Sequence, residues 1–149
     1  MPLSDLMAAV HTQVLPAADQ ETTLRAAADL LGCAQVGADE LYASLCEREA
    51  LGSTAIGHGI AIPHGRCHGL SEPHGALLRL RQPVTFGHEA VDLVFAIAVP
   101  AHYTHQHLML LSELAERFSL PGFREALRQA PDAQALHELL LSEPVSSAA

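Results

Sequence analysis

Histidine is the residue type that stands out in this chain for the chemistry it could perform. The 149 residues include ten His but only two Tyr and four Phe. Imidazole is suited to proton transfer, metal ligation and phosphoryl transfer, because its pKa lies near neutral pH. All eight basic residues are Arg. Guanidinium groups are therefore the permanent cations available to bind an anion, and a lysine Schiff base is excluded.

One histidine, His64, lies in a context that favours nucleophilic attack on phosphorus. The apolar run 60–62 predicts a short strand, and residues 63–65 predict a turn that places His64 at the end of that strand. Neutral imidazole attacks phosphorus without a strong base. Gly59 and Gly65 would leave space for the donor group of a second protein.

The segment from Arg48 to Arg66 reads REALGSTAIGHGIAIPHGR. It resembles the active-site segment of the fructose/mannitol-type (type 2) enzyme IIA domains of the phosphoenolpyruvate-dependent phosphotransferase system, approximately R-E-x-x-G-S-T-G-I-G-x-G-I-A-I-P-H-G-[RK]. A second marker of that family is the pair His107-Leu108, which follows a predicted strand ending in Val-Pro. The resemblance extends over about residues 19–141 and is greatest to the nitrogen-regulatory enzyme IIA.

The resemblance implies a site and its partners. His64 would be the phosphorylated residue, His107 would lie beside it, and Arg48 would lie near the phosphoryl group. The donor would be the histidine-containing phosphocarrier protein or its nitrogen-branch counterpart, and no cofactor is required. The acceptor would be either a regulated target protein or the domain of a fructose or mannitol permease. Because no permease or carrier domain is fused to this chain, we expect the regulatory role rather than the transport role.

Physical arguments support a role for His107. If Thr104 caps the helix that follows it, residues 105–107 occupy the first turn, where free N–H groups and the helix dipole attract an anion. The same dipole disfavours imidazolium, so we expect His107 to be a neutral N–H donor to a phosphoryl oxygen. Arg48 would add a charge-assisted contact.

Structural alternatives exist for both residues. His107 could pack beside Leu111 and Leu114, and Arg48 could pair with Glu47 or Glu49 on a helix surface. A binding module that is not phosphorylated is a third functional class. In that class zinc is one possibility, through the histidines of the H-x-x-H-x-H stretch with a fourth ligand from an earlier segment. These residues are His102, His105 and His107, with His64 or His68.

Three features depart from the family pattern. Ala55 stands where Gly is usual, and His58 stands where Asn or Glu is common. We expect a stiffer loop with an additional titrating group. The connection 87–90 is shorter than the acidic connection of many relatives, which bears on the choice of partner.

The elements expected to position these residues are helices, then strands, then helices. Helices are predicted for 19–31, starting near Asp19 or Thr22 and ending at Gly32, and for 39–51. Strands follow at 60–62, 76–80 and 91–99, and helices at about 104–118, 124–130 and 132–141. The last strand is apolar on both faces, so we expect an α/β (α+β) fold with a central mixed sheet covered by helices on both faces.

Composition narrows the remaining possibilities. One domain over 1–149 is expected, with a tail at about 142–149. The net charge of -9 disfavours nucleic acid as a partner. No apolar run reaches the roughly 18 residues that span a bilayer. Residues 1–5 lack the basic region of a signal peptide, which predicts a cytoplasmic protein without membrane insertion. Three cysteines predict no disulfide framework.

Overall fold

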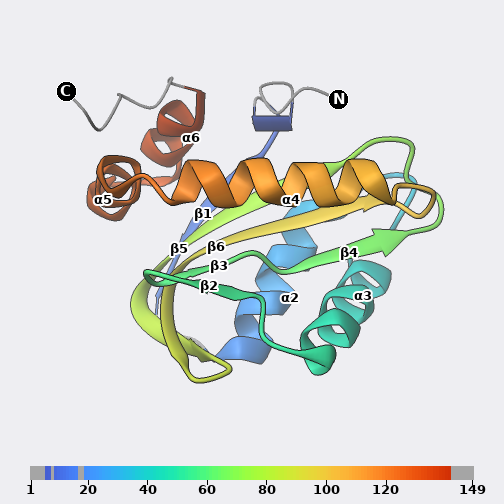
Figure 1. The fold of residues 1–149 in the computed structure, drawn as a ribbon, viewed down its shortest axis with the longest axis horizontal. Helices are drawn as coiled ribbons and strands as arrows, with labels where there is room; N and C mark the ends of the chain where they lie inside the picture. The colour runs from blue at the N-terminus through green and yellow to red at the C-terminus, as the bar shows by residue number, and fades with distance from the viewer. Residues whose placement is uncertain (1–5, 8, 17–18, 142–149) are drawn as a thin grey trace.

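A mixed β-sheet forms the centre of the computed structural model, which describes residues 6–7, 9–16 and 19–141 (Figure 1). The expected tail at 142–149 and the first five residues lie outside this range. The described strands are β1 His11–Leu15, β2 Ala55–Gly57, β3 Ile60–Ala61, β4 His64–Cys67, β5 His74–Phe86 and β6 Glu89–Pro100. Their order is β1-β5-β6-β3-β2, and β4 also pairs with β6. The pairs β1/β5, β3/β6 and β4/β6 are parallel, whereas β5/β6 and β2/β3 are antiparallel.

Five described helices pack against this sheet: α2 Gln20–Leu31, α3 Ala38–Leu51, α4 His105–Phe118, α5 Pro121–Gln129 and α6 Ala133–Leu141. The side chain of Asp19 accepts a hydrogen bond from the Thr22 amide and so caps α2. The C-caps of α2 and α3 are Gly32 and Gly52, and Gly52 has a φ of 155° that favours glycine. These bounds confirm the predicted helices to within a few residues.

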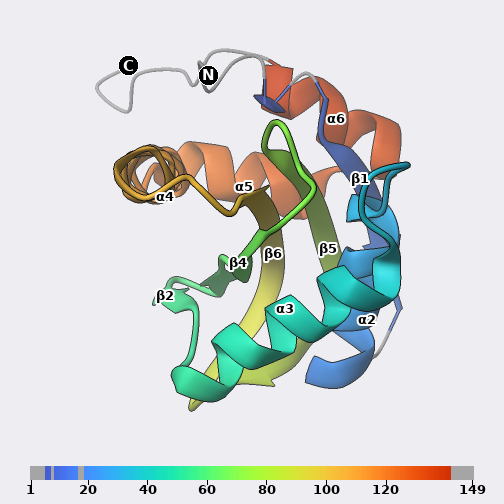
Figure 2. The ribbon, with the colours of Figure 1, turned by 90° about the vertical axis from the view of Figure 1, so that its right-hand side faces the viewer.

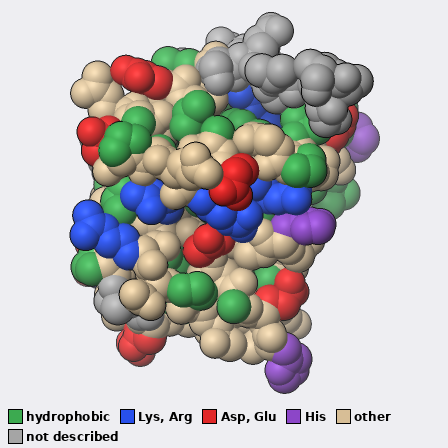
Figure 3. Space-filling view, turned by 90° about the vertical axis from the view of Figure 1, so that its left-hand side faces the viewer, with side chains coloured by type: hydrophobic (Ala, Val, Ile, Leu, Met, Phe, Trp, Pro, Cys, Tyr) green, Lys and Arg blue, Asp and Glu red, His purple; other side chains and the backbone are tan. Residues whose placement is uncertain are grey.

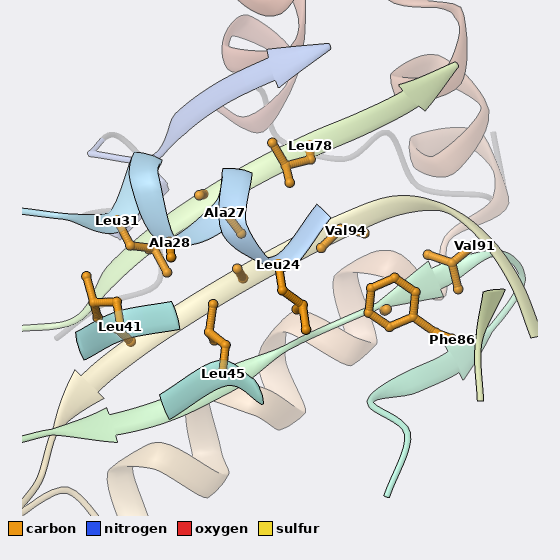
Figure 4. Close-up of a cluster of buried hydrophobic side chains, with 14 of the residues drawn as sticks. Leu24, Ala27, Ala28, Leu31, Leu41, Leu45, Leu78, Phe86, Val91 and Val94 are labelled. Atoms are coloured by element: carbon orange, nitrogen blue, oxygen red, sulfur yellow. The ribbon is translucent and has the colours of Figure 1, made fainter. Parts of the chain in front are cut away.

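The helices cover both faces of the sheet, as the apolar strand at 91–99 predicted. In Figure 2, α4, α5 and α6 lie on one side of the strands and α2 and α3 on the other. Figure 4 shows the core under α2 and α3, where Leu24, Leu41 and Leu45 pack toward Leu78 and Val94. The second core lies under the other helices, and β6 contributes buried side chains to both. Burying each such side chain contributes about 1.5–3 kcal/mol.

Several strands were missed or predicted too short. Nothing in the sequence indicated β1 or β2. β5 and β6 run beyond the predicted 76–80 and 91–99 and meet in a two-residue turn, where Gly87 has a φ of 64°. The end of β5 was missed because residues 81–83 are exposed and the pairing register shifts between Arg79 and Val84. An apolar pattern cannot indicate such an exposed segment.

The predicted turn at 63–65 was wrong. Ile62 and Pro63 link β3 to β4, and His64 is the first residue of β4 rather than the end of the preceding strand. β4 pairs in parallel with β6, with His64 opposite Ile97 and Cys67 opposite Pro100. This strand has polar side chains and no apolar run, so its hydrogen bonds to β6 define it. The pairing gives His64 a fixed place in the sheet.

None of the helices in the described part of the chain is long and apolar enough to span a membrane.

Candidate functional site

His64 is held by hydrogen bonds to both of its ring nitrogens. Nδ1 lies 2.8 Å from the carbonyl oxygen of Ile62, and the Nε–H of Arg48 donates to Nε2 across 3.2 Å. A guanidinium is always a donor, so Nε2 must be the acceptor and Nδ1 must carry the proton. In this neutral tautomer the lone pair lies on Nε2, which becomes a nucleophile once Arg48 releases the hydrogen bond it donates there.

Arg48 lies in the last turn of α3 and also donates from Nη1 to the carbonyl oxygen of Gly52, at 2.8 Å. The alternative in which Arg48 pairs with an acidic neighbour is not observed in the described part of the chain. Glu49 instead accepts hydrogen bonds from the amide and the hydroxyl of Thr54, at 2.9 and 2.6 Å. Arg48 is therefore directed to His64, and Glu49 fixes the loop that leads into β2.

His107 lies in the first turn of α4, and its ring centroid is 5.1 Å from that of His64. Thr104 precedes the helix as expected, but its side chain makes no capping hydrogen bond. Nδ1 of His107 is buried and has no hydrogen-bond partner within the described residues. A buried nitrogen without a partner is costly and uncommon, and a catalytic role is one explanation for it. The structure thus brings Arg48, His64 and His107 together.

Burial lowers the pKa of both histidines. For His64 burial is the main cause, opposed by the hydrogen bond to Ile62 and assisted by the charge of Arg48. The pKa of His107 falls to about 4, first through burial and then through His64, Arg66 and Arg48. We expected a neutral His107 because of the helix dipole, whereas burial is the larger cause. Both rings are neutral at pH 7.

A pocket of about 850 Å³ surrounds the two rings. Residues of β4, α3 and α4 line it, and Figure 2 shows β4 running between these two helices. Its lining residues come from these three elements and the loops beside them: Ser44, Glu47, Arg48, Leu51, His64, Gly65, Arg66, His68, Ala101, Thr104, His105, His107 and Leu108. All of these residues are half-buried or exposed, so the pocket is open to solvent.

Arg66 is a pocket residue to which the sequence analysis assigned no role. Alternate side chains of a strand point to the same face, so Arg66 shares the face of His64 on β4. Its Nη1 donates to the carbonyl oxygen of Tyr103 at 3.4 Å. Gly65 between them faces α3, where an added Cβ would overlap the hydroxyl of Ser44. The last position of the family pattern, Arg or Lys, corresponds to Arg66 and was the one sequence signal for it. That signal indicates a place beside His64 only when residues 64–67 are known to form a strand.

The other histidines do not form a metal site. No group of three or more His, Cys, Asp or Glu residues in the described ranges could hold a metal ion. His68 and His105 line the pocket, whereas the ring of His102 packs edge-on against Tyr103. His58 lies in the β2–β3 turn with a φ of 57°, and its carbonyl accepts a hydrogen bond from Arg128. The three cysteines are free thiols.

Comparison with known proteins gives a consistent result. Residues 8–143 match the family model described as "Phosphoenolpyruvate-dependent sugar phosphotransferase system, EIIA 2". A "Nitrogen regulatory protein" of Pseudomonas aeruginosa is 40% identical over 107 residues, which cover 70% of each chain. One from Bradyrhizobium diazoefficiens is 34% identical over 155 aligned residues, covering 99% of this chain and 100% of that protein.

A solved structure agrees with these relatives. The crystal structure of "Nitrogen Regulatory Protein IIA-Ntr" from Neisseria meningitidis superposes with a TM-score of 0.81 and 31% identity, covering 93% of this chain and 98% of that one. The similarity of fold therefore extends over nearly the whole of both chains.

Proposed function

Because the chain belongs to the EIIA 2 family of the phosphoenolpyruvate-dependent sugar phosphotransferase system, and is a phosphocarrier component of it, we propose that Nε2 of His64 accepts the phosphoryl group. The observation that carries this proposal is the tautomer of His64. Its Nδ1 proton is engaged by Ile62, so the lone pair lies on Nε2, where it accepts a hydrogen bond from Arg48. The approach of phosphorus would replace this hydrogen bond and leave the guanidinium beside the phosphoryl oxygens.

The transfer balances without an external base. The lone pair of Nε2 attacks phosphorus, the N–P bond of the donor phosphohistidine breaks, and the donor ring keeps that electron pair. The ring of His64 becomes positive while the phosphoryl group carries negative charge. The carbonyl oxygen of Ile62, already 2.8 Å from Nδ1, stabilises the positive ring.

Three further side chains support binding of the phosphoryl oxygens. Arg48 and Arg66 line the pocket and supply positive charge. His107 is neutral at pH 7 and carries one N–H, which can donate to an oxygen of the phosphoryl group. Such preorganised donors are the main means of catalysis in phosphoryl transfer. We assign His107 and Arg48 these stabilising roles.

The regulatory branch is part of the proposal. Relatives and a solved structure that are 31–40% identical to this chain bear the name nitrogen regulatory protein. We propose a histidine-containing phosphocarrier protein as the donor and a regulated target protein as the partner whose binding depends on the phosphorylation state. The whole chain would act as one cytoplasmic domain.

The test is phosphorylation of the purified chain by phosphoenolpyruvate, enzyme I and each histidine phosphocarrier in turn, followed by intact mass. We expect one acid-labile phosphoryl group on the wild type and on His88→Ala, and none on His64→Ala. His88 is exposed at the β5–β6 turn and is therefore a matched control. Absence of phosphate on the wild type with every carrier would refute the phosphocarrier role. Phosphate retained by His64→Ala would refute the site.

The same assay separates regulation from transport. Addition of a fructose or mannitol permease domain should leave the phosphoryl group on His64 if the chain is regulatory. Rapid transfer to the permease domain would instead show a transport component.

A further inference from the structure

Two exposed leucines stand on opposite sides of the pocket around His64. Leu51 at the end of α3 is 83% exposed, and Leu108 in the first turn of α4 is 64% exposed. Both line the pocket, although their helices cover opposite faces of the sheet. Exposed apolar residues gathered around a polar site are typical of a surface that another protein covers. We call this pair the leucine rim.

The arginines inside the rim lack acidic partners. Neither Arg48 nor Arg66 forms an ion pair with a carboxylate in the described residues, although the chain has a net charge of -9. Glu47, the one acidic residue among those that line the pocket, is exposed.

The opposite arrangement occurs on the side of the molecule where α5 and the β2–β3 turn lie. There arginine side chains gather with acidic ones among them (Figure 3). Arg128 on α5, for example, is bound by both oxygens of Asp92. The cations of the pocket are thus left available for an anion from outside the described chain.

We propose that the unphosphorylated pocket receives an Asp or Glu side chain of a regulated target protein, with apolar neighbours of that residue packed on the leucine rim. The inference rests on the proposed function and names the chemistry of its partner. A carboxylate matches the fork of a guanidinium, and it would also satisfy a donor on the neutral ring of His107. The contact is non-covalent and needs no co-reactant.

Phosphorylation and target binding are then mutually exclusive. A phosphoryl group on Nε2 would lie beside Arg48, whose Nε is 3.2 Å from that nitrogen. The phosphoryl group would occupy the guanidinium of Arg48, which is then unable to bind the carboxylate. Its negative charge would also repel the carboxylate at short range. Regulation therefore follows from competition of two anions for one pocket.

The experiment uses two synthetic peptides as probes, Ac-Leu-Glu-Leu-NH2 and Ac-Leu-Gln-Leu-NH2, titrated into the unphosphorylated chain with methyl NMR detection. We expect the Glu peptide to shift Leu51 and Leu108, to leave the exposed Ile56 unchanged, and to bind about tenfold more tightly than the Gln peptide. Arg66→Gln should remove most of that preference. Arg81→Gln, which removes an exposed arginine outside the pocket lining, should retain it.

Equal affinity for the two peptides, or shifts outside the pocket, would overturn carboxylate recognition. Equal affinity of the Glu peptide for the phosphorylated and unphosphorylated chains would overturn the competition. Failure of the chain to take up phosphate would refute the proposed function instead. The comparison of Glu and Gln peptides would still decide whether the pocket binds a carboxylate.

Discussion

Arg48 donates a hydrogen bond from Nε to Nε2 of His64, although Arg48 lies in the last turn of a helix and His64 begins a strand. The bond selects the tautomer of the imidazole and holds a cation beside the nitrogen proposed to be phosphorylated. The same guanidinium can bind a phosphoryl oxygen once the lone pair of Nε2 is used. The first prediction follows from this double role.

Replacement of Arg48 should slow phosphoryl uptake, and this loss of rate should be the main effect of the change. We expect Arg48→Gln to lower the rate constant about 10- to 100-fold, since one charged donor to the reacting group is lost. Arg48→Lys should be intermediate, because it keeps the charge without the planar fork. The measurement is rapid-quench uptake from the phosphorylated carrier, with Arg81→Gln as the control of equal charge change. Equal rates in Arg48→Gln and Arg81→Gln would show that Arg48 does not contribute to phosphoryl transfer.

The titration of His64 should reflect its burial. Because its pKa lies below the usual 6.5, less than half of the His64 rings are protonated at pH 6.5, and half-protonation is reached only below that pH. Protonation of His64 should therefore reduce phosphoryl uptake by less than half between pH 8 and 6.5. NMR titration of the ring proton on Cε1 gives the midpoint directly. A midpoint above 6.5 would contradict the assignment of burial as the dominant cause.

His107 should make the stability of the fold depend on pH. In the unfolded chain its imidazole takes up a proton near pH 6.5, whereas in the folded chain it does so only near pH 4. Protonation thus favours the unfolded state, and the free energy of unfolding should fall between pH 6.5 and 4. We expect this contribution to be about 1–2 kcal/mol, since the ring is only partly buried.

Urea unfolding of the wild type and of His107→Gln at several pH values isolates this contribution. The wild type should lose more stability than the variant on acidification, because the carboxylates common to both cancel in the difference. Parallel pH profiles for the two proteins would show that His107 is not buried as described.

Gly65→Ala should strain the contact between β4 and α3. The added methyl group would overlap the hydroxyl oxygen of Ser44, and such overpacking costs about 1–3 kcal/mol. Ser44→Ala in the same chain should recover part of that loss, because it removes the oxygen that is closest to the new Cβ. Chemical denaturation of the two single variants and the double variant gives the coupling energy. Additive effects would mean that Ser44 and Gly65 do not contact each other.

The sequence was sufficient for the helices and for the family. Capping by Asp19, the glycine after Leu31 and the apolar run at 91–99 are local signals, and each predicted an element that the structure contains. The motif around His64 and the pair His107-Leu108 indicated the family that the comparisons confirm.

Features that depend on pairing between distant segments were not predictable in this way. β1 and β4 are defined by parallel hydrogen bonding to β5 and β6, and β4 carries polar side chains. Arg66 was not assigned a role for the same reason, since its place beside His64 depends on the alternation of a strand that the sequence pattern does not show. The approach of Ser44 to Gly65 is likewise visible only in three dimensions.

The parallel pairing of β4 with β6 also has a consequence for how the protein matures. His64 can pair opposite Ile97 only when β6 is present beside it, and His107 follows later still in the sequence. Contacts between residues so far apart form slowly compared with local helices. A nascent or partly unfolded chain would hold His64 but not the surrounding pocket. We therefore expect only the fully folded protein to carry phosphate.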